Sequence, residues 1–222
     1  MHGGGYISEV TPRQTNNRQD IWICRHGNRI DFVNPSWKGT DPHLSFDGVV
    51  QGKETGIRLR DEEIQHIFAS PFLRTVETAF HIAESLDLSI KIEHGACEWL
   101  NPKWASPRYM TPGDLAKRFP RVDVNHATLV RPQYPETWEE CMARCQKTIS
   151  LLSDAYRTNI LVIGHGASVE GLTQGLLGHE QAISTGLCSL TKVSQRNGQW
   201  SLELNGDTSH LSGGERCPEQ FH

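Results

Sequence analysis

Two short apolar runs constrain the fold of this chain more than any other feature, because each ends in a histidine that glycine follows. Residues 21–24 lead into His26, and residues 160–163 lead into His165. Uninterrupted apolar runs of this length, stopped by glycine, predict buried strands. In open α/β sheets, ligands bind beyond the carboxyl ends of the strands. The two runs therefore predict a parallel sheet that presents both histidines to one site.

The remaining patterns predict strands and helices that alternate along the chain. Strands are expected at residues 20–24, 64–69, 89–92 and 160–163, and a hairpin at 187–193 and 199–204 around Asn197-Gly198. Helices are expected to begin at the N-cap residues Ser45, Ser70 (with Pro71 following), Thr111 and Thr137, and again near Ala167. This alternation predicts an α/β fold with a mixed, mostly parallel central sheet flanked by helices. The expected organisation is a loose leader over 1–19, one domain over 20–205 and a polar tail over 206–222.

Arginines gather around the first histidine and at the start of a later helix. Arg25 and Arg29 bracket His26, and guanidinium groups placed so closely repel one another unless an anion shares the site. Arg74 falls in the first turn of the helix that Ser70 opens, where the helix dipole disfavours a cation unless an anion binds there. The planar fork of arginine matches phosphate oxygens. These positions predict a phosphate site, with a solvated basic turn around His26 as the alternative.

Two carboxylates follow the strand expected at 89–92. Glu98 lies beside Trp99 and two further apolar residues, which would partly desolvate it, whereas Glu93 lies closer to the strand. Desolvation favours the protonated carboxyl, which suits a general acid. We therefore expect Glu98 rather than Glu93 to donate a proton, with a turn-capping role for Glu98 as the alternative.

Composition excludes several classes of protein. The chain has 222 residues, a formal net charge of −4 and 36% hydrophobic residues, which is ordinary for one globular domain. The acidic balance argues against nucleic acid or a membrane surface as a partner, and no apolar stretch approaches a spanning helix. The six scattered cysteines include no Cys-x-x-Cys pair, so a metal protein is the least supported hypothesis. Free thiols favour a cytoplasmic protein.

Three segments together resemble the histidine phosphatase superfamily, also called the phosphoglycerate mutase-like family. They are Arg25-His26-Gly27 after a strand, Ser70-Pro71 followed by Arg74 and Thr78-Ala79, and His165-Gly166 after a second strand. The pair Glu98-Trp99 and the run Arg29-Ile30-Asp31 are closest to the suppressor of T-cell receptor signalling and ecdysteroid-phosphate phosphatase type. Asn28 stands where mutase-type members carry Glu or Gln, so the resemblance favours a phosphatase over a mutase.

The resemblance implies a metal-independent phosphomonoester hydrolase without a cofactor. In this reading His26 attacks phosphorus to form a phosphohistidine, with its other ring nitrogen held by a backbone carbonyl such as that of Gly27, and Glu98 protonates the leaving alcohol. Arg25, Arg29, Arg74 and His165 would surround the phosphate, and the amides of Gly166 and Ala167 would add donors at a helix N-terminus. The implied partners are a phosphorylated small molecule or a phosphoprotein, and phosphate ion, while a homodimer stays open. The alternatives are a phosphoglycerate or phosphosugar mutase and a non-catalytic module that binds a phosphorylated ligand.

Residues 101–135 are rich in proline and aromatic residues and are expected to form an insertion over the site. Trp37, Trp99, Trp104 and Tyr109 are candidates for an apolar substrate wall, with a core role as the alternative. The helix expected at 137–156 has an apolar stripe and is interpreted as a core helix that carries no chemistry.

Overall fold

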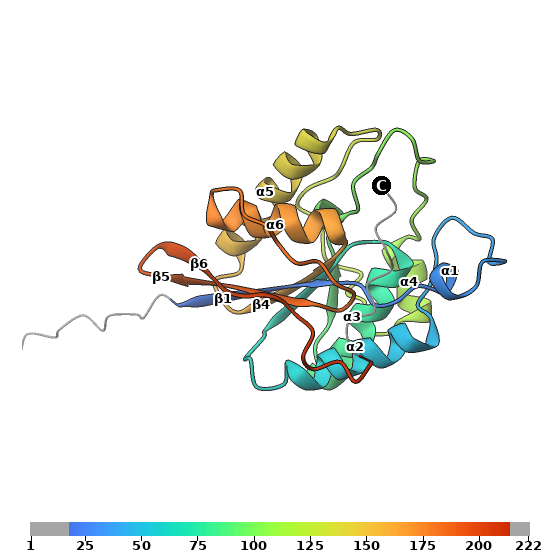
Figure 1. Ribbon diagram of the computed structural model, residues 1–222, viewed down its shortest axis with the longest axis horizontal. Helices are drawn as coiled ribbons and strands as arrows, with labels where there is room; N and C mark the ends of the chain where they lie inside the picture. Colours follow the sequence, from blue (N-terminus) through green and yellow to red (C-terminus); the bar gives the residue numbers. More distant parts are fainter. Residues whose placement is uncertain (1–17, 214–222) are drawn as a thin grey trace, which may run out of the picture.

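A six-stranded sheet with helices on both faces makes up the protein, whose computed structural model describes residues 18–213 (Figure 1). The strands lie in the order β3-β2-β4-β1-β5-β6. Their bounds are β1 Gln19–Arg25, β2 His66–Ala69, β3 Ile90–Ile92, β4 Ile160–Gly164, β5 Leu190–Arg196 and β6 Gln199–Asp207. The neighbouring strands among β3, β2, β4 and β1 pair in parallel. Strand β5 pairs antiparallel with both β1 and β6. The predicted mixed, mostly parallel sheet is confirmed.

Both faces of the sheet are covered, which explains the uninterrupted apolar runs in its central strands. Along β1, Trp22 and Cys24 pack on one side with α2 (Phe46–Arg58) and α3 (Leu73–Leu86). Ile21 and Ile23 face the other side, where α5 (Trp138–Ala155) and α6 (Gly166–Leu177) pack against each other and the sheet. Figure 1 shows these two helical pairs above and below the sheet. The alternation of side chains along a strand therefore divides the core into two halves.

Three of the predicted helix caps are present, and one is wrong. Ser45, Thr111 and Thr137 each accept a hydrogen bond from the first turn of their helix. The helix assigned to Ser70 instead begins at Leu73, with Phe72 as its N-cap and no capping hydrogen bond from that side chain. Its first amide, that of Leu73, donates to the carboxylate of Asp41 at 2.9 and 3.1 Å. The carboxylate of Asp41, from a distant loop, thus accepts the hydrogen bond at the helix N-terminus that was expected of the Ser70 side chain.

The insertion divides between two places. Its helix α4 (Pro112–Arg118) packs Leu115, and the following residues Phe119 and Val122, into the core beside α3. On either side of α4, residues 101, 104–107 and 134 line a cavity together with Arg74 and Glu98. Only part of residues 101–135 therefore lies over the expected site. Two short helices, α1 (Ile30–Val33) and the 3-10 turn η1 (His94–Ala96), follow the carboxyl ends of β1 and β3.

The chain ends differ from the expected domain bounds in detail. Asn197 and Gly198 have φ values of 52° and 81°, as the predicted hairpin turn requires. β6 continues to Asp207, and Leu211 is buried, so the packed chain extends past the expected boundary at 205. Most of the expected leader and residues 214–222 of the expected tail lie outside the described residues.

Two further findings concern the described residues 18–213. None of their helices has the length and apolar character needed to cross a membrane. Five cysteines are buried as free thiols, among them Cys141 and Cys145 on the inner face of α5.

Candidate active site

Parallel pairing of two neighbouring strands brings the two histidines together. Arg25, the last residue of β1, pairs with Gly164, the last residue of β4. The amide of His26 continues the pairing and donates to the carbonyl of Gly164 at 3.0 Å. The imidazole rings of His26 and His165 then lie edge to face with centroids 5.4 Å apart. Residues separated by most of the chain therefore share one site, as the two apolar runs predicted.

His26 is held as a neutral ring with one nitrogen available. Its side chain is buried, and Nδ1 lies 2.8 Å from the carbonyl oxygen of Gly27. A carbonyl oxygen only accepts, so Nδ1 carries the proton and Nε2 keeps its lone pair. Burial lowers the pKa of His26 well below its ordinary value, and the charges of Arg74 and Arg25 lower it further. A neutral imidazole that keeps the lone pair on Nε2 is the form that a nucleophile needs.

His165 is held in the opposite tautomer. Its Nδ1 lies 3.1 Å from a terminal nitrogen of Arg74, which can only donate, so Nδ1 accepts. The proton then resides on Nε2, which donates to the hydroxyl of Ser70 at 2.8 Å. Burial lowers the pKa of His165 well below its ordinary value, with Arg74 as the next cause. Ser70 is thus a partner of the site rather than a helix cap.

Arg74 is the central cation of the site. It is 4% exposed, and its guanidinium lies 4.5 Å above the Phe72 ring. Its terminal nitrogens lie 3.7 Å from Asp41 and 3.8 Å from Glu98. Burial lowers the pKa of Arg74 to about 10, although Glu98 opposes that shift. A buried cation in the first turn of a helix, balanced only by loosely spaced carboxylates, is the arrangement expected where an anion binds.

The two carboxylates lie in different surroundings. Glu98 faces the site, where its Oε2 lies 3.6 Å from Nδ1 of His165 and its Oε1 accepts from the amide of Trp99. Glu93 is buried away from the cavity and accepts from backbone amides of the 128–130 segment. Burial tends to raise the pKa of Glu93, but His126 and those hydrogen bonds outweigh burial and hold the pKa below its ordinary value. Glu93 is therefore a structural carboxylate, whereas Glu98 lies beside Arg74 and His165 at the cavity.

The other two arginines lie on different sides of the histidines. Arg29 lines the cavity, pairs with Asp31 at 2.5 Å and lies 4.2 Å above the ring of Phe32. Arg25 donates to the carbonyl of Thr185 at 2.6 Å, next to the start of α6. Gly166 lies beside it, since a Cβ there would be 3.9 Å from the Arg25 guanidinium carbon. Gly166 and Ala167, whose amides are expected to contact phosphate, thus form the start of α6 beside Arg25.

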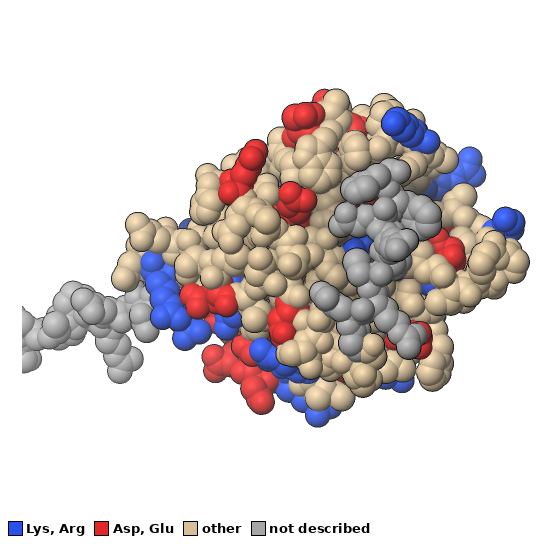
Figure 2. All heavy atoms as spheres, viewed as in Figure 1, with Lys and Arg blue, Asp and Glu red and all other residues tan. Residues whose placement is uncertain are grey.

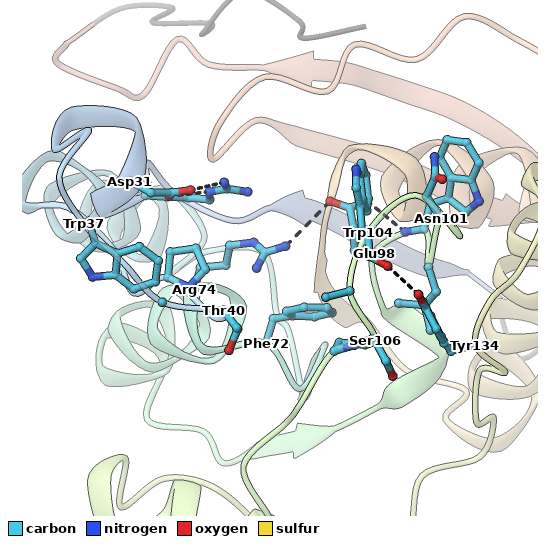
Figure 3. A pocket seen from close by; sticks show the side chains of 17 residues that line it. Asp31, Trp37, Thr40, Phe72, Arg74, Glu98, Asn101, Trp104, Ser106 and Tyr134 are labelled. Atoms are coloured by element: carbon cyan, nitrogen blue, oxygen red, sulfur yellow. Dashed lines mark hydrogen bonds and ion pairs between the residues drawn. The ribbon is translucent and has the colours of Figure 1, made fainter.

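A cavity of about 450 Å³ opens over Arg74 and Glu98 (Figure 3). His26 and His165 lie behind its lining. In Figure 3 Arg74 points toward Glu98, with Trp37 and Asp31 on one side and Trp104 and Tyr134 on the other. Trp37, Trp99 and Trp104 all line the cavity, which the sequence left open. Tyr109 does not line it, because its ring packs against Phe72 at 5.1 Å and its hydroxyl lies 3.6 Å from the Cys97 sulfur.

On the face shown in Figure 2, acidic and basic side chains of the described residues are interspersed among uncharged ones. Within residues 18–213, no group of three or more His, Cys, Asp and Glu side chains could hold a metal ion.

Sequence reasoning missed one residue that acts on this site from α5. Arg144 is buried and donates to the carbonyl of Glu98 at 3.1 Å, so the helix is not only a core element. One signal was present, because Arg144 occupies the apolar stripe one turn after Cys141 and one turn before Thr148. A charged residue at such a position needs a buried partner.

Comparisons with known proteins agree with this geometry. A family model described as the histidine phosphatase superfamily (branch 1) matches residues 21–208. The chain is 29% identical to the transcription factor tau 55 kDa subunit of Saccharomyces cerevisiae, over 90% of this chain and 58% of that protein. It is 25% identical to the ecdysteroid-phosphate phosphatase of Drosophila melanogaster, over 82% of this chain and 31% of that protein. The chain thus spans less than two thirds of either relative.

Among solved structures, the ecdysone phosphate phosphatase of Bombyx mori in complex with tungstate has a similar fold. The TM-score is 0.74 at 21% identity, and the match covers 92% of this chain and 95% of that one. This similarity concerns the sheet, the helices on both of its faces and their order along the chain.

Proposed function

Since the chain belongs to the histidine phosphatase superfamily, we propose that it hydrolyses phosphate monoesters through a phosphohistidine on His26. The observation that carries the proposal is a neutral His26 with its Nδ1 bound to a carbonyl. Its ring lies 5.4 Å from that of His165, and His165 contacts Arg74 and Glu98, which line the cavity. A phosphate monoester carries between one and two negative charges near neutral pH. The arginines supply the positive charge that such a group needs, so the proposed reaction is independent of a metal ion.

The first step transfers the phosphoryl group to the protein. Arg29, Arg74 and His165 bind the phosphate oxygens, with Arg25 and the amides of Gly166 and Ala167 behind them, and reduce the repulsion of an incoming nucleophile. The Nε2 lone pair of His26 attacks phosphorus in line. As the bond between phosphorus and the ester oxygen breaks, Glu98 gives its proton to that oxygen.

The second step returns the protein to its starting state. Glu98, now a carboxylate, takes a proton from a water molecule that attacks phosphorus. The bond between phosphorus and Nε2 breaks, and inorganic phosphate leaves. Glu98 is protonated again and His26 regains its lone pair, so atoms and charge balance over the cycle.

The cavity walls favour a substrate with an apolar or aromatic body. Trp37, Trp99 and Trp104 present three indole rings beside the phosphate position, and aromatic walls bind apolar groups through large contact areas. We therefore propose an aryl or otherwise apolar phosphomonoester. A phosphorylated aromatic side chain of a protein is included in this class.

The direct test is hydrolysis of p-nitrophenyl phosphate by the purified protein in EDTA. We expect turnover, and we expect His26→Ala to reduce kcat by a factor on the order of 10³ or more, because the nucleophile is gone. His179→Ala, at an exposed histidine remote from the cavity, is the matched control and should retain full activity. Unchanged turnover in His26→Ala would contradict the assignment.

Two alternatives are distinguished by the same assay. A mutase would transfer the phosphoryl group to an acceptor sugar or acid faster than to water. A non-catalytic module would bind phosphate without turnover, and the relative that is a subunit of a transcription factor favours keeping this candidate. Against it stand His26 and Glu98, which a binding module does not need.

We also propose a cytoplasmic location. The five buried free thiols support it, because cysteines stay reduced in that compartment. Fractionation of cells that express the tagged full-length protein would test this.

A further inference from the structure

The segment that carries Glu98 is held by one buried side chain of α5. Arg144 donates to three carbonyls of this segment, those of Gly95 at 2.7 Å, Cys97 at 3.2 Å and Glu98 at 3.1 Å. Since a guanidinium offers five donors in a fixed plane, these bonds fix the path of the backbone. The carbonyl of Glu98 is therefore tied to a rigid helix.

Glu136 completes this attachment from the other direction. Its carboxylate binds the Arg144 guanidinium at two points, 2.5 and 3.0 Å. The same carboxylate accepts from the amide of Leu100 at 3.0 Å, and its backbone carbonyl accepts from the indole N–H of Trp99 at 3.1 Å. The residues on both sides of Glu98 are thus fixed by one pair, which we name the Glu136–Arg144 pair.

Both members of the pair lie outside the cavity lining and are buried, with 5% and 7% exposure. A buried ion pair is weak evidence for stability, because an apolar pair of similar volume often serves as well. Apart from contacts of Arg144 with the sulfurs of Cys141 and Cys145 on its own helix, the bonds that the pair makes to other groups go to the backbone and the indole around Glu98. In turn, the Glu98 carboxylate accepts from the Trp99 amide. We propose that the Glu136–Arg144 pair positions the Glu98 carboxyl for proton transfer, an inference that rests on the proposed phosphatase function.

A positioning role for proton transfer has a signature that general destabilisation lacks. p-Nitrophenolate is a weak base and leaves with little help, whereas the alkoxide of phosphoserine must be protonated as it leaves. A misplaced Glu98 therefore slows hydrolysis of phosphoserine more than that of p-nitrophenyl phosphate. Loss of folded protein would reduce both rates by the same factor.

The test compares kcat/KM for these two substrates in wild type and Arg144→Lys, because kcat/KM reports the first phosphoryl transfer and not the later attack by water, which is common to both substrates. Lysine keeps the charge but cannot bind Glu136 at two points and three carbonyls together. We expect kcat/KM for phosphoserine to fall at least about ten-fold more than kcat/KM for p-nitrophenyl phosphate, within the range that a placed acid contributes.

Two further variants keep the test decisive if Arg144→Lys folds poorly. Glu136→Gln keeps an acceptor for the Leu100 amide but loses the charge, and it should show the same substrate dependence to a smaller degree. Leu152→Ala, in the core on the same helix, is the control. It should lower kcat/KM for both substrates by the same factor, through loss of folded protein alone. Equal losses of kcat/KM on both substrates in the Arg144 and Glu136 variants would overturn the positioning role alone. A wild-type protein that hydrolyses neither substrate would overturn the proposed function as well.

Discussion

At the scale of single residues, the site holds two neutral histidines among buried guanidinium groups. His26 and His165 are 1% and 0% exposed, and Arg74 lies in hydrogen-bond contact with His165. Burial disfavours the charged form of each ring, and the neighbouring arginines add to that effect. The cluster therefore keeps its histidines unprotonated until an anion balances the arginines. A dianion at the cavity would favour protonation of His165 and so turn it into a donor to the phosphate.

This arrangement predicts how stability depends on pH. The pKa values of His26 and His165 are lowered in the folded protein, while the unfolded chain has histidines near the ordinary value of about 6.5. As the pH falls below that value, the unfolded state binds protons that the folded state does not, so stability falls. The loss is at most about 1.4 kcal/mol per pH unit for each histidine.

Urea unfolding in phosphate-free buffer at pH 7.5, 6.5 and 5.5 measures this loss. The double variant His26→Asn, His165→Asn should lose less stability over the same interval than wild type. An equal dependence on pH in the two proteins would show that these rings titrate normally.

At the scale of elements, the turn after β1 is shaped by its crossing with α2. A Cβ on Gly48 would lie 2.1 Å from the carbonyl oxygen of Asn28, and a Cβ on Gly27 would lie 2.8 Å from the carbonyl oxygen of Gly48. Both contacts are with backbone, which cannot swing aside as a side chain can. The close crossing lets the turn from His26 to Arg29 lie flat against the start of the helix. Two glycines, one on each segment, thus set the position of His26.

Gly48→Ala should therefore displace this turn. We expect a loss of more than about 1 kcal/mol of stability from overpacking and a lower kcat, because His26 moves with the turn. Gly113→Ala on α4 is the matched control, since its Cβ would meet nothing closer than 3.9 Å, and it should be neutral or slightly stabilising. Thermal unfolding and p-nitrophenyl phosphate assays of both variants give the comparison. Wild-type activity in Gly48→Ala would mean that the crossing does not set the position of His26.

At the scale of the whole molecule, the cavity is assembled from segments far apart in the sequence. Its lining comes from residues 29–42, 72–74, 98–107 and 134. The sheet edge supplies the charged end, and the loop after β1 and the insertion supply the aromatic walls (Figure 3). We therefore expect the charged end to determine turnover and the aromatic walls to determine substrate preference. A substitution in the walls should alter substrate preference without abolishing turnover.

Trp104→Ala tests this separation. The side chain is 54% exposed, so its removal should leave the fold intact. We expect kcat/KM for 1-naphthyl phosphate to fall about ten-fold, the equivalent of roughly 1.4 kcal/mol of aromatic contact, with little change for phosphoserine. Phe46→Ala, at an 82% exposed aromatic on α2, serves as control and should change neither value. Equal effects on both substrates would place Trp104 outside the substrate wall.

The sequence by itself determined the strands, their largely parallel order and the edge at which the two histidines meet. The reason is physical: residues 21–24 and 160–163 are apolar throughout because both faces of a central parallel strand are buried, and a histidine that follows such a strand lies at the sheet edge. The sequence also indicated Arg74 as a contact for an anion, and Glu98 rather than Glu93 as a proton donor. A cation in a first helical turn and a carboxyl among apolar neighbours are local signals, and both side chains line the cavity.

Only the tertiary structure decided the roles that depend on distant partners. Ser70 has the sequence of a helix cap, yet its hydroxyl meets His165 and the amide of Leu73 is bound by Asp41. Arg144 lies within an apolar stripe, and its purpose becomes visible only where the carbonyls of residues 95–98 approach it. Hydrogen-bond partners and the division of residues 101–135 between core and cavity depend on how segments pack. Periodicity and local propensity describe a segment and its own faces, and they carry no information on which distant group will meet each face.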